Sequence, residues 1–460
     1  MMYREILDDL CAWKCKSDDN RYPLILQGAR QVGKTWVLKE FAKTQFKNYV
    51  YVNFENTEEL YDIFEETLDP HKILEYLSIF SSQDIIPGET LIIFDEIQTV
   101  PRALTSLKYF KEEVPEYHIC CAGSLLGIHL KSGTSFPVGK VEFLDIYPMS
   151  FKEFIIANGF GKYIDYLEKL DIDDLKRFSN IQDLKHLLRI YFYVGGMPRP
   201  VQTWVDTKNF SKVKSEIKNI AQSYLNDFAK YSDSKTCLKI RQVWDSIPEQ
   251  LAKENSSKFT FGIISKSARA KDYEIAIQWL VDASCLTKVN AVKTSKLPLA
   301  AYAELDLFKL YCLDIGLLSY LSGLDPQLIL TSDKLFSEYN GALTEQFIMQ
   351  ELRNYGKTFY WTEGNYEVDF IIQQYNNVIP IEVKAGTVVK TKSLNYYNEK
   401  YTPKIRVKSS LRDFDYNSGV INLPLYVFWL LPSLLKSLLN DTNAINSDLN
   451  TFIKKMNITF

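Results

Sequence analysis

Short apolar runs alternate with helix-like segments along the first part of the chain. Residues 23–26 are apolar and lead into a glycine-rich loop, GARQVGKT, at residues 28–35. After the loop, apolar side chains recur at a spacing that places them on one face of a helix. They are Trp36, Val37, Leu38, Phe41 and Ala42. This pattern predicts a buried strand, a loop and a helix, in that order.

Two further apolar runs predict strands of the same sheet. Residues 91–94 are apolar and precede Asp95 and Glu96, and the segment HICCAGS ends at Ser124. In an open α/β sheet, ligands bind at the carboxyl ends of the strands. We therefore expect the two carboxylates and the Ser124 hydroxyl to lie at the edge of the sheet that carries the glycine-rich loop.

The middle of the chain is patterned as helices. Residues 161–227 are rich in Leu, Ile, Lys and Asp at helical spacing, with a Gly195-Gly196 turn, and predict a helical lid. Residues 228–300 contain two helix-like segments followed by β-branched residues, which suggests a winged helix. We expect linker helices at residues 301–336.

Helix and strand patterns return near the C-terminus. An amphipathic segment, EYNGALTEQFIMQELRNYG at residues 338–356, carries Glu345 near its middle. The alternating segments FYWTEGNYEVDFIIQQ and VIPIEVKAG follow, joined by a polar turn, and predict two strands. Asp369 lies on the first strand, while Glu382 and Lys384 lie on one face of the second. These elements predict a separate α/β domain at residues 337–460.

The longest apolar stretch, LPLYVFWLLPSLL, starts at Leu423. It is too short to span a bilayer and contains Pro424 and Pro432. We interpret it as a buried strand followed by a helix, and we expect no membrane partner.

Composition limits the function classes. A chain of 460 residues that is 46% hydrophobic can build several domains, roughly two to four. The net charge of −3 gives no overall attraction to nucleic acid, so such binding must come from local basic patches. Seven cysteines without a pair of C-x-x-C motifs favour a reducing, cytoplasmic compartment. The four histidines are far apart in sequence, which argues against a zinc site.

Two segments are locally basic. Residues 258–296 contain seven basic and three acidic side chains, and residues 384–408 contain seven basic and one acidic side chain. Such clusters suit contact with the phosphates of DNA or RNA, although a solvated surface has the same composition. Tyr396, Tyr397 and Tyr401 lie within the second segment and either stack on bases or pack in a core.

The glycine-rich loop has the residue types that bind nucleoside triphosphates. Gly28 and Gly33 allow backbone N–H groups to surround phosphates, Lys34 reaches the β and γ oxygens, and the Thr35 hydroxyl ligates Mg²⁺. The predicted cofactors are therefore ATP and Mg²⁺.

The residues that follow the other two strands complete this predicted site. Asp95 would hold Mg²⁺ through water, and Glu96 would orient or deprotonate the attacking water. Ser124 is either a γ-phosphate contact or the N-cap of the next helix.

Several segments together resemble a family of prokaryotic AAA+ ATPases that carry a C-terminal domain of unknown function. They are the loop, FDEIQ, CAGSLLG, VGKVEFLDIYPMSFKEF and YVGGMPRPV. The resemblance implies an AAA+ ATPase core at residues 1–160. Members of this family usually have Gly-Arg where this chain has Gly139-Lys140, and no arginine occurs between Arg102 and Arg177. If this position supplies a finger to the γ-phosphate, in cis or from a neighbour, Lys140 offers a point charge in place of a bidentate fork.

The C-terminal helix and strands resemble the restriction-endonuclease-like fold. In that fold a helical Glu, a strand Asp and a Glu-x-Lys gather around Mg²⁺, and the resemblance gives these roles to Glu345, Asp369, Glu382 and Lys384. Carboxylate oxygens suit Mg²⁺, which activates water, and a lysine positions the nucleophile. A salt-bridged Glu382-Lys384 pair at a sheet edge is the structural alternative.

We expect a multi-domain α/β protein: a P-loop AAA+ parallel sheet with a helical lid, a winged helix and a C-terminal restriction-endonuclease-like domain. The predicted function is ATP hydrolysis coupled to a nuclease-like domain that acts on DNA or RNA. The alternative is an ATP-dependent switch whose inactive C-terminal domain binds a protein partner. A second copy of the chain is a further candidate partner.

Overall fold

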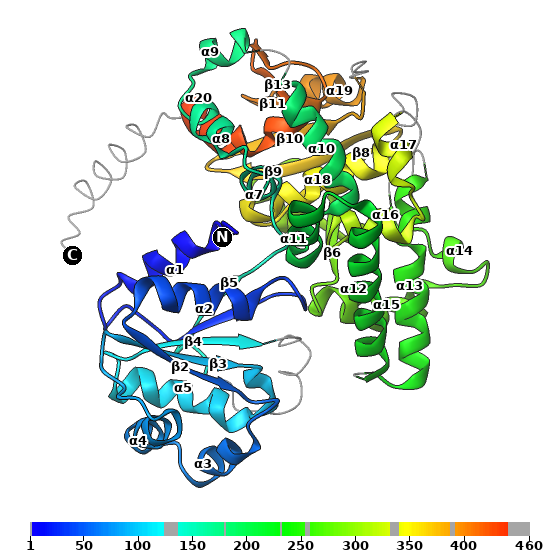
Figure 1. The fold of residues 1–460 in the computed structure, drawn as a ribbon. Helices are drawn as coiled ribbons and strands as arrows, with labels where there is room; N and C mark the ends of the chain where they lie inside the picture. Colours follow the sequence, from blue (N-terminus) through cyan, green and yellow to red (C-terminus); the bar gives the residue numbers. More distant parts are fainter. Residues whose placement is uncertain are drawn as a thin grey trace, which may run out of the picture. The chain divides into compact units, whose positions relative to one another are not determined.

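The computed structural model describes residues 2–123, 137–178, 181–230, 232–253, 258–331, 340–386 and 392–439. The chain divides into two compact units, each built from separate stretches of sequence (Figure 1). The first comprises Met1–Asn158, Arg189–Asn290 and Leu305–Ser332. The second comprises Gly159–Leu188, Ala291–Glu304 and Asp333–Phe460.

The first unit contains a five-stranded sheet in the order β2-β3-β4-β1-β5, and each neighbouring pair is parallel. Its strands are β1 (Leu24–Gln27), β2 (Asn48–Asn53), β3 (Thr90–Asp95), β4 (His118–Gly123) and β5 (Glu142–Asp145). All side chains of β3 and β4 are buried, because helices cover both faces of a parallel sheet.

Helices cover this sheet on both faces (Figure 1). One face carries α1 (Ile6–Lys14) and α2 (Lys34–Gln45), and the other carries α3 (Tyr61–Glu66), α4 (Pro70–Ser81) and α5 (Pro101–Glu113). β1 and α2 confirm the strand, loop and helix predicted from the apolar pattern. The second face forms a continuous apolar core with strand side chains such as Ile92 and Phe94.

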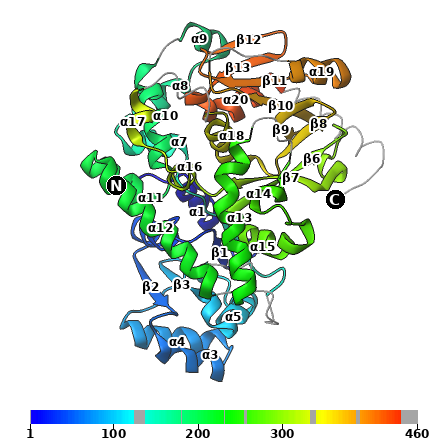
Figure 2. The same ribbon diagram turned by 90° about the vertical axis from the view of Figure 1, so that its right-hand side faces the viewer.

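A set of helices makes up most of the rest of the first unit. They are α7 (Phe151–Ala157), α11 (Pro198–Thr207), α12 (Phe210–Lys230), α13 (Ser234–Ala252), α14 (Phe261–Ile264), α15 (Ala270–Asp282), α16 (Ile315–Leu321) and α17 (Pro326–Thr331). Helices α12, α13 and α15 lie side by side in both views (Figures 1 and 2). Helix α10 (Gln182–Val194) contains the boundary between the two units.

The sequence predicts only linker helices at residues 301–336. The structure differs, because strand β7 (Ala303–Cys312) occupies the first part of this range. The segment AELD alternates apolar and polar side chains with the period of a strand, and the helices α16 and α17 follow only after it.

The second unit is built on a mixed sheet. Its strands are β8 (Phe359–Glu363), β9 (Tyr366–Gln374), β10 (Asn377–Val383), β11 (Arg406–Ser410), β12 (Asp415–Asn417) and β13 (Val420–Pro424). The order is β12-β13-β11-β10-β9-β8, and the sheet continues through β6 (Leu286–Val292) and β7 (Figure 2). Each of these last two strands contains a point at which the chain passes from one unit to the other. The antiparallel β9–β10 pair confirms the predicted strands and turn, whereas β10, β11 and β13 are parallel.

Helices complete the second unit. They are α8 (Gly161–Leu167), α9 (Ile172–Arg177), α18 (Asn340–Glu351), α19 (Lys392–Tyr401) and α20 (Leu431–Leu439). Leu394 and Tyr397 of α19 pack against Trp361 and Val368 of the sheet. The core position of Tyr397 agrees with packing and not with base stacking.

The apolar stretch from Leu423 differs in detail from the expectation. Strand β13 starts earlier and ends at Pro424, a short 3-10 helix covers Leu425–Leu430, and α20 begins at Leu431. Proline lacks the N–H group that would continue the strand ladder. Among the described residues, no helix is both long and apolar enough to cross a membrane.

Candidate functional site

The glycine-rich loop connects β1 to α2 in a conformation that requires glycine at two points. Gly33 is the N-cap of α2 and has φ of 99°, a left-handed value that glycine adopts without strain. A Cβ atom on Gly28 would lie 2.2 Å from the Ile146 carbonyl oxygen. The loop can therefore lie directly against the backbone that follows β5 and present its N–H groups at the start of α2.

Lys34 points back into the loop. Its ammonium donates to the carbonyl oxygens of Gly28 at 3.0 Å and Ala29 at 2.8 Å. Burial lowers its pKa to about 8, against the opposite effect of Glu96 and Asp95. A phosphate is a stronger acceptor than a carbonyl, so this buried cation is placed to bind phosphate oxygens.

Thr35 and Asp95 converge at the carboxyl end of the sheet. The Thr35 hydroxyl donates to Asp95 Oδ2 at 2.7 Å, and the Tyr51 hydroxyl donates to the same oxygen at 2.8 Å. Burial and the Asp95 charge raise the pKa of Tyr51. This oxygen-rich donor set fits Mg²⁺, which Thr35 and Asp95 would hold. Sequence reasoning missed Tyr51, whose only signal is its position on β2, the strand next to β3.

Glu96 has a strained backbone. Its φ of 52° and ψ of 43° place a residue with a Cβ atom in the left-handed region, which is costly and frequent at active sites. Its carboxylate accepts a hydrogen bond from Gln98 Nε2 at 2.5 Å. Ser124, the predicted γ-phosphate contact or N-cap, lies outside the described residues.

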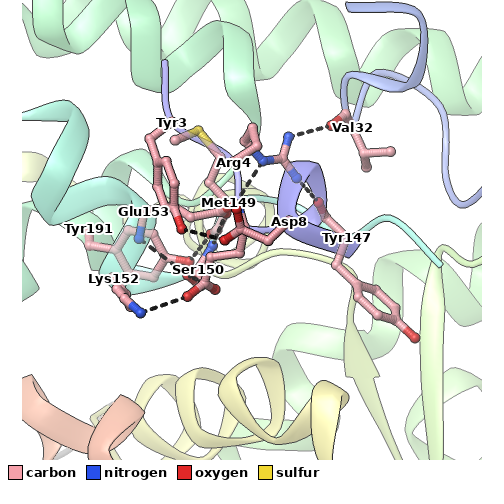
Figure 3. Close-up of polar contacts among 11 residues, drawn as sticks. Tyr3, Arg4, Asp8, Val32, Tyr147, Met149, Ser150, Lys152, Glu153 and Tyr191 are labelled. Carbon is pink, nitrogen blue, oxygen red and sulfur yellow. Dashed lines mark hydrogen bonds and ion pairs between the residues drawn. The ribbon is translucent and has the colours of Figure 1, made fainter. Parts of the chain in front are cut away.

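An N-terminal arginine, also missed from the sequence, supports the loop (Figure 3). Arg4 donates to the Val32 carbonyl at 2.9 Å and to the Tyr147 carbonyl at 2.7 Å, and its Nε lies 3.1 Å from Glu153 Oε1. Glu153 belongs to a capping box at the start of α7 with Ser150. We call Arg4 and Glu153 the N-terminal clasp, because they join the loop to the segment after β5.

Helix α12 also contacts the loop. Arg30 Nη1 lies 2.8 Å from Asp227 Oδ1, and Gln31 Nε2 donates to the Ser223 hydroxyl at 2.7 Å. The Tyr224 hydroxyl donates to the Arg30 carbonyl at 2.7 Å. Two neighbouring loop residues are thereby joined to three residues of α12.

Lys140 lies near the amino ends of the strands, whereas the loop lies at their carboxyl ends. It precedes β5, whose first residue Glu142 pairs with Leu24 at the amino end of β1, and its ammonium is 3.0 Å from Glu112. The loop follows the carboxyl end of β1. A finger supplied by Lys140 in cis is therefore excluded, and only a finger supplied to another copy is compatible with this position.

The second unit brings together three of the four predicted C-terminal residues. Lys384 Nζ lies 2.7 Å from Glu382 Oε1 and 3.7 Å from Asp369 Oδ2, and Asp369 accepts a hydrogen bond from the Val383 N–H at 2.6 Å. Both carboxylates are buried. Glu345 lies on α18, where its charge acts on both Glu382 and Lys384.

The charges of this cluster are strongly coupled. Burial and the nearby Asp369 raise the pKa of Glu382 to about 8, against the opposite effect of Lys384. Burial acts to lower the pKa of Lys384, but Asp369 and Glu382 outweigh it and raise that pKa. Within the described part of the chain, Glu382 Oε2 is buried and has no hydrogen-bond partner. An unpartnered buried oxygen is costly and is placed to bind a cation or a donor.

The donor set limits the kind of metal site that is compatible with the cluster. Among the described residues, no group of three or more His, Cys, Asp and Glu side chains could hold a metal ion. Asp369 and Glu382 alone fit Mg²⁺, because this ion commonly takes one or two carboxylates and completes its shell with water and phosphate.

A basic strand lies beside this cluster. Lys408 on β11 pairs with Glu382 on the neighbouring parallel strand, so the two side chains share a face of the sheet. Burial and the charges of Arg406 and Arg412 lower the pKa of Lys408. The positive side chains thus gather next to the buried carboxylates.

Family comparisons match three segments of the chain. Residues 20–155 match a family described as an AAA domain (AAA_14). Residues 185–328 match a domain of unknown function (DUF8612), and residues 340–428 match another (DUF4143). No curated protein matches the chain.

Several solved structures are similar to this chain. The Walker-type ATPase PABY2304 of Pyrococcus abyssi is 15% identical, with 70% of this chain and 96% of that chain covered and a TM-score of 0.43. PCH-2 of C. elegans is 12% identical, with coverages of 43% and 59% and a TM-score of 0.26. Cdc6p from Pyrobaculum aerophilum is 12% identical, with coverages of 70% and 92% and a TM-score of 0.25.

At these TM-scores the structural likenesses carry no argument of their own. The AAA match spans the five-stranded parallel sheet, the glycine-rich loop and the Asp95-Glu96 pair. Residues 20–155 are therefore an AAA-type P-loop ATPase domain.

Proposed function

We propose that the chain couples ATP hydrolysis to a C-terminal nuclease-like site that acts on nucleic acid. The observation that carries the second half of this proposal is the buried cluster of Asp369, Glu382 and Lys384, in which one Glu382 oxygen has no partner. These are two carboxylates and a lysine, which are residue types found in metal-dependent phosphodiesterases, and strands β9 and β10 hold them close together.

The ATP site has a defined division of roles. Lys34 binds the β and γ oxygens, Thr35 and Asp95 hold Mg²⁺, and Glu96 orients the attacking water. When bound, Mg²⁺ neutralises charge on the phosphates. Tyr51 and Gln98 hold the two carboxylates in place through the hydrogen bonds they donate.

At the C-terminal site, Asp369 and Glu382 would hold Mg²⁺ or Mn²⁺, which supplies an activated water and neutralises the phosphate. A bound cation would stabilise the charged form of Glu382, whose pKa is otherwise raised to about 8. Lys384 is placed beside both carboxylates to orient a nucleophile. Lys408 supplies positive charge on the same face for a phosphate backbone.

The first unit also has elements that suit DNA. Helices α13, α14 and α15 precede β6 and β7, which is the order of helices and strands in a winged helix. Lys271, which is exposed on the first turn of α15, and nearby Lys266 and Arg269 give this segment positive charge. We propose that this segment contacts phosphates.

One observation favours a different function. Lys384 forms ion pairs with both carboxylates, and an ammonium in that position offsets part of their charge without a metal ion. The C-terminal unit would then be an inactive platform for a protein partner, and the ATPase would act as a nucleotide-dependent switch.

A cation-dependent melt of the full chain tests the nuclease-like site. We expect Mn²⁺ to raise the melting temperature of the parent and of Glu363→Ala, because Glu363 forms an exposed ion pair with Lys400 away from the cluster. Asp369→Ala should lose this shift. Cleavage of single-stranded DNA, duplex DNA and RNA should require Mn²⁺ or Mg²⁺ and disappear in Asp369→Ala and Lys384→Ala.

The outcomes separate the two functions. No cation-dependent shift in the parent would exclude the metal site and favour the switch. A shift without cleavage of any of the three substrates, together with no salt-sensitive binding to them, would also favour the switch. Lys34→Ala should abolish nucleotide binding and leave the cation shift unchanged, which keeps the two sites distinguishable.

A further inference from the structure

The phosphate loop contains its own arginine, and helix α12 holds that arginine. The Arg30 guanidinium is 2.8 Å from Asp227 Oδ1 and 3.9 Å from Glu55 Oε1. Its side chain is 25% exposed, whereas that of Asp227 is 6% exposed. This is a partly buried ion pair between the nucleotide site and a helix that is outside the AAA match at residues 20–155.

The charges around this pair belong to the ATP site. Arg30 acts to lower the pKa of Lys34, which places its positive charge near the ammonium that binds phosphate. Burial raises the pKa of Asp227, Arg30 and Lys230 oppose this effect, and Glu96 and Glu55 add to it. Asp227 therefore lies close enough to the candidate catalytic Glu96 for the two carboxylates to repel each other.

Asp227 is held by Arg30 on one oxygen only. Its second oxygen, Oδ2, is buried and has no hydrogen-bond partner among the residues that the structure describes. A buried carboxylate depends on its cation, because a buried charge that loses its partner is strongly destabilising. Loss of Arg30 would therefore make the present position of α12 unfavourable.

Other candidate cations near the sheet are committed elsewhere. Arg4 is buried in the N-terminal clasp, Arg199 lies 2.7 Å from Glu216, and Arg102 lies 3.6 Å from Glu65. Lys140 is at the opposite edge of the sheet. Arg30 is the guanidinium that the phosphate loop itself carries.

We propose that Arg30 is a γ-phosphate ligand that Asp227 holds back, and that ATP draws Arg30 from Asp227 whereas ADP does not. The γ-phosphate adds negative charge between Lys34 and Glu96, so it attracts Arg30 and repels Asp227. Exchange of the partner of Arg30 leaves Asp227 without its ion-pair partner and loosens α12. The presence of the γ-phosphate is thereby communicated to α12 and to the helices beside it. This inference rests on ATP binding at the loop.

Affinities for two nucleotides test the exchange. The full chain is titrated with Mg²⁺ and a fluorescent non-hydrolysable ATP analogue, and in parallel with fluorescent ADP. Asp227→Asn removes the competing charge and should raise the preference for the ATP analogue over ADP by about tenfold, the size of a typical coupling. Arg30→Gln should lower that preference by a similar factor and reduce turnover.

A matched control separates charge from loosening of the interface. Ser223→Ala removes the hydrogen bond from Gln31 to α12 without any change in charge, so the preference between the nucleotides should stay at the parent value. Hydrogen exchange in α12 should be faster with the ATP analogue than with ADP in the parent, and equally fast with both in Arg30→Gln.

Two results would overturn the inference. One is an equal change in the two affinities in both Asp227→Asn and Arg30→Gln. The other is a shift in nucleotide preference in Ser223→Ala as large as that in Asp227→Asn. Failure of the parent to bind either nucleotide would instead overturn the assignment of the loop, and this inference with it.

Discussion

Individual residues of the ATP site differ in how far they can be predicted from sequence. Lys34 and Thr35 follow from a local motif, since all the atoms that define their role lie within one loop. Arg4 has partners at residues 32, 147 and 153, and no local pattern connects an arginine before α1 with those positions. Asp227 is missed for the same reason. Side chains that support a motif across long sequence separations become visible only when the fold is known.

The N-terminal clasp leads to a prediction about nucleotide affinity. Arg4→Ala should leave Glu153 buried without its cation and remove the partner of the Val32 carbonyl, so we expect a loss of about 3 to 5 kcal/mol in the free energy of unfolding and weaker ATP binding. Denaturant unfolding and nucleotide titration measure the two effects.

The double variant Arg4→Ala/Glu153→Met is the matched control. Because it removes both charges of the buried pair, it should be more stable than Arg4→Ala alone, although the Val32 carbonyl still lacks its donor. If both variants unfolded like the parent, the clasp would have no structural role.

At the scale of secondary structure, amphipathic and fully buried segments are predicted well. β1, β3, β4, β9 and β10 coincide with apolar or alternating runs because a packed sheet imposes those patterns. β7 was missed within a region expected to be helical. Its alternating pattern covers only the first few residues, and from Phe308 onward its side chains are continuously buried. An apolar run alone does not distinguish a strand from a helix.

The packing of β4 against α1 predicts a dependence of stability on pH. His118 begins β4 and its ring contacts Trp13 and Phe46 edge-on. Burial, together with the charge of Arg21, lowers its pKa to about 4. In the unfolded chain the imidazole has its ordinary pKa of 6.5 and binds a proton below that pH, whereas in the folded chain it stays neutral until the pH is near 4. Stability is therefore lost as the pH falls from 6.5 toward 4.

We expect this group to remove about 2 kcal/mol between about pH 7 and about pH 5. Thermal melts of His118→Gln at both pH values should show a smaller decrease than the parent. His71→Gln, at an exposed position in α4, is the control and should decrease like the parent. An undiminished decrease in His118→Gln would assign the acid sensitivity to other groups.

At the scale of the whole chain, the ATPase domain could be predicted from the sequence, but the assembly of the two units from separate stretches could not. The residues that match the AAA domain form one continuous stretch. Each of the two units, in contrast, is assembled from separate stretches of the chain. The five consecutive segments expected from the sequence assume that neighbours in sequence fold together. The way in which separate stretches assemble into one unit depends on long-range packing, and apolar periodicity carries no information about such packing.

The position of Lys140 gives a prediction that depends on the number of chains. Lys140→Arg should leave ATP turnover per molecule unchanged in dilute solution, because residue 140 is at the sheet edge opposite the phosphate loop. Turnover measured across a dilution series provides the test. An increase at high concentration alone would identify a finger supplied to a second copy, and an increase at every concentration would contradict the geometry.

The interleaving of the two units also determines what happens while the chain is being made. Strands β8 to β13 emerge from the ribosome after residue 358, yet Trp361 donates to the carbonyl oxygen of Lys293 at 3.3 Å and Tyr397 contacts Ser295, both in a stretch made much earlier. Residues 291–304 must wait for these partners. A fragment cut before residue 337 would therefore expose a strand edge, and a fragment that starts there would lack part of its own core. We expect either fragment to depend on chaperones, and the two to recover solubility when produced together.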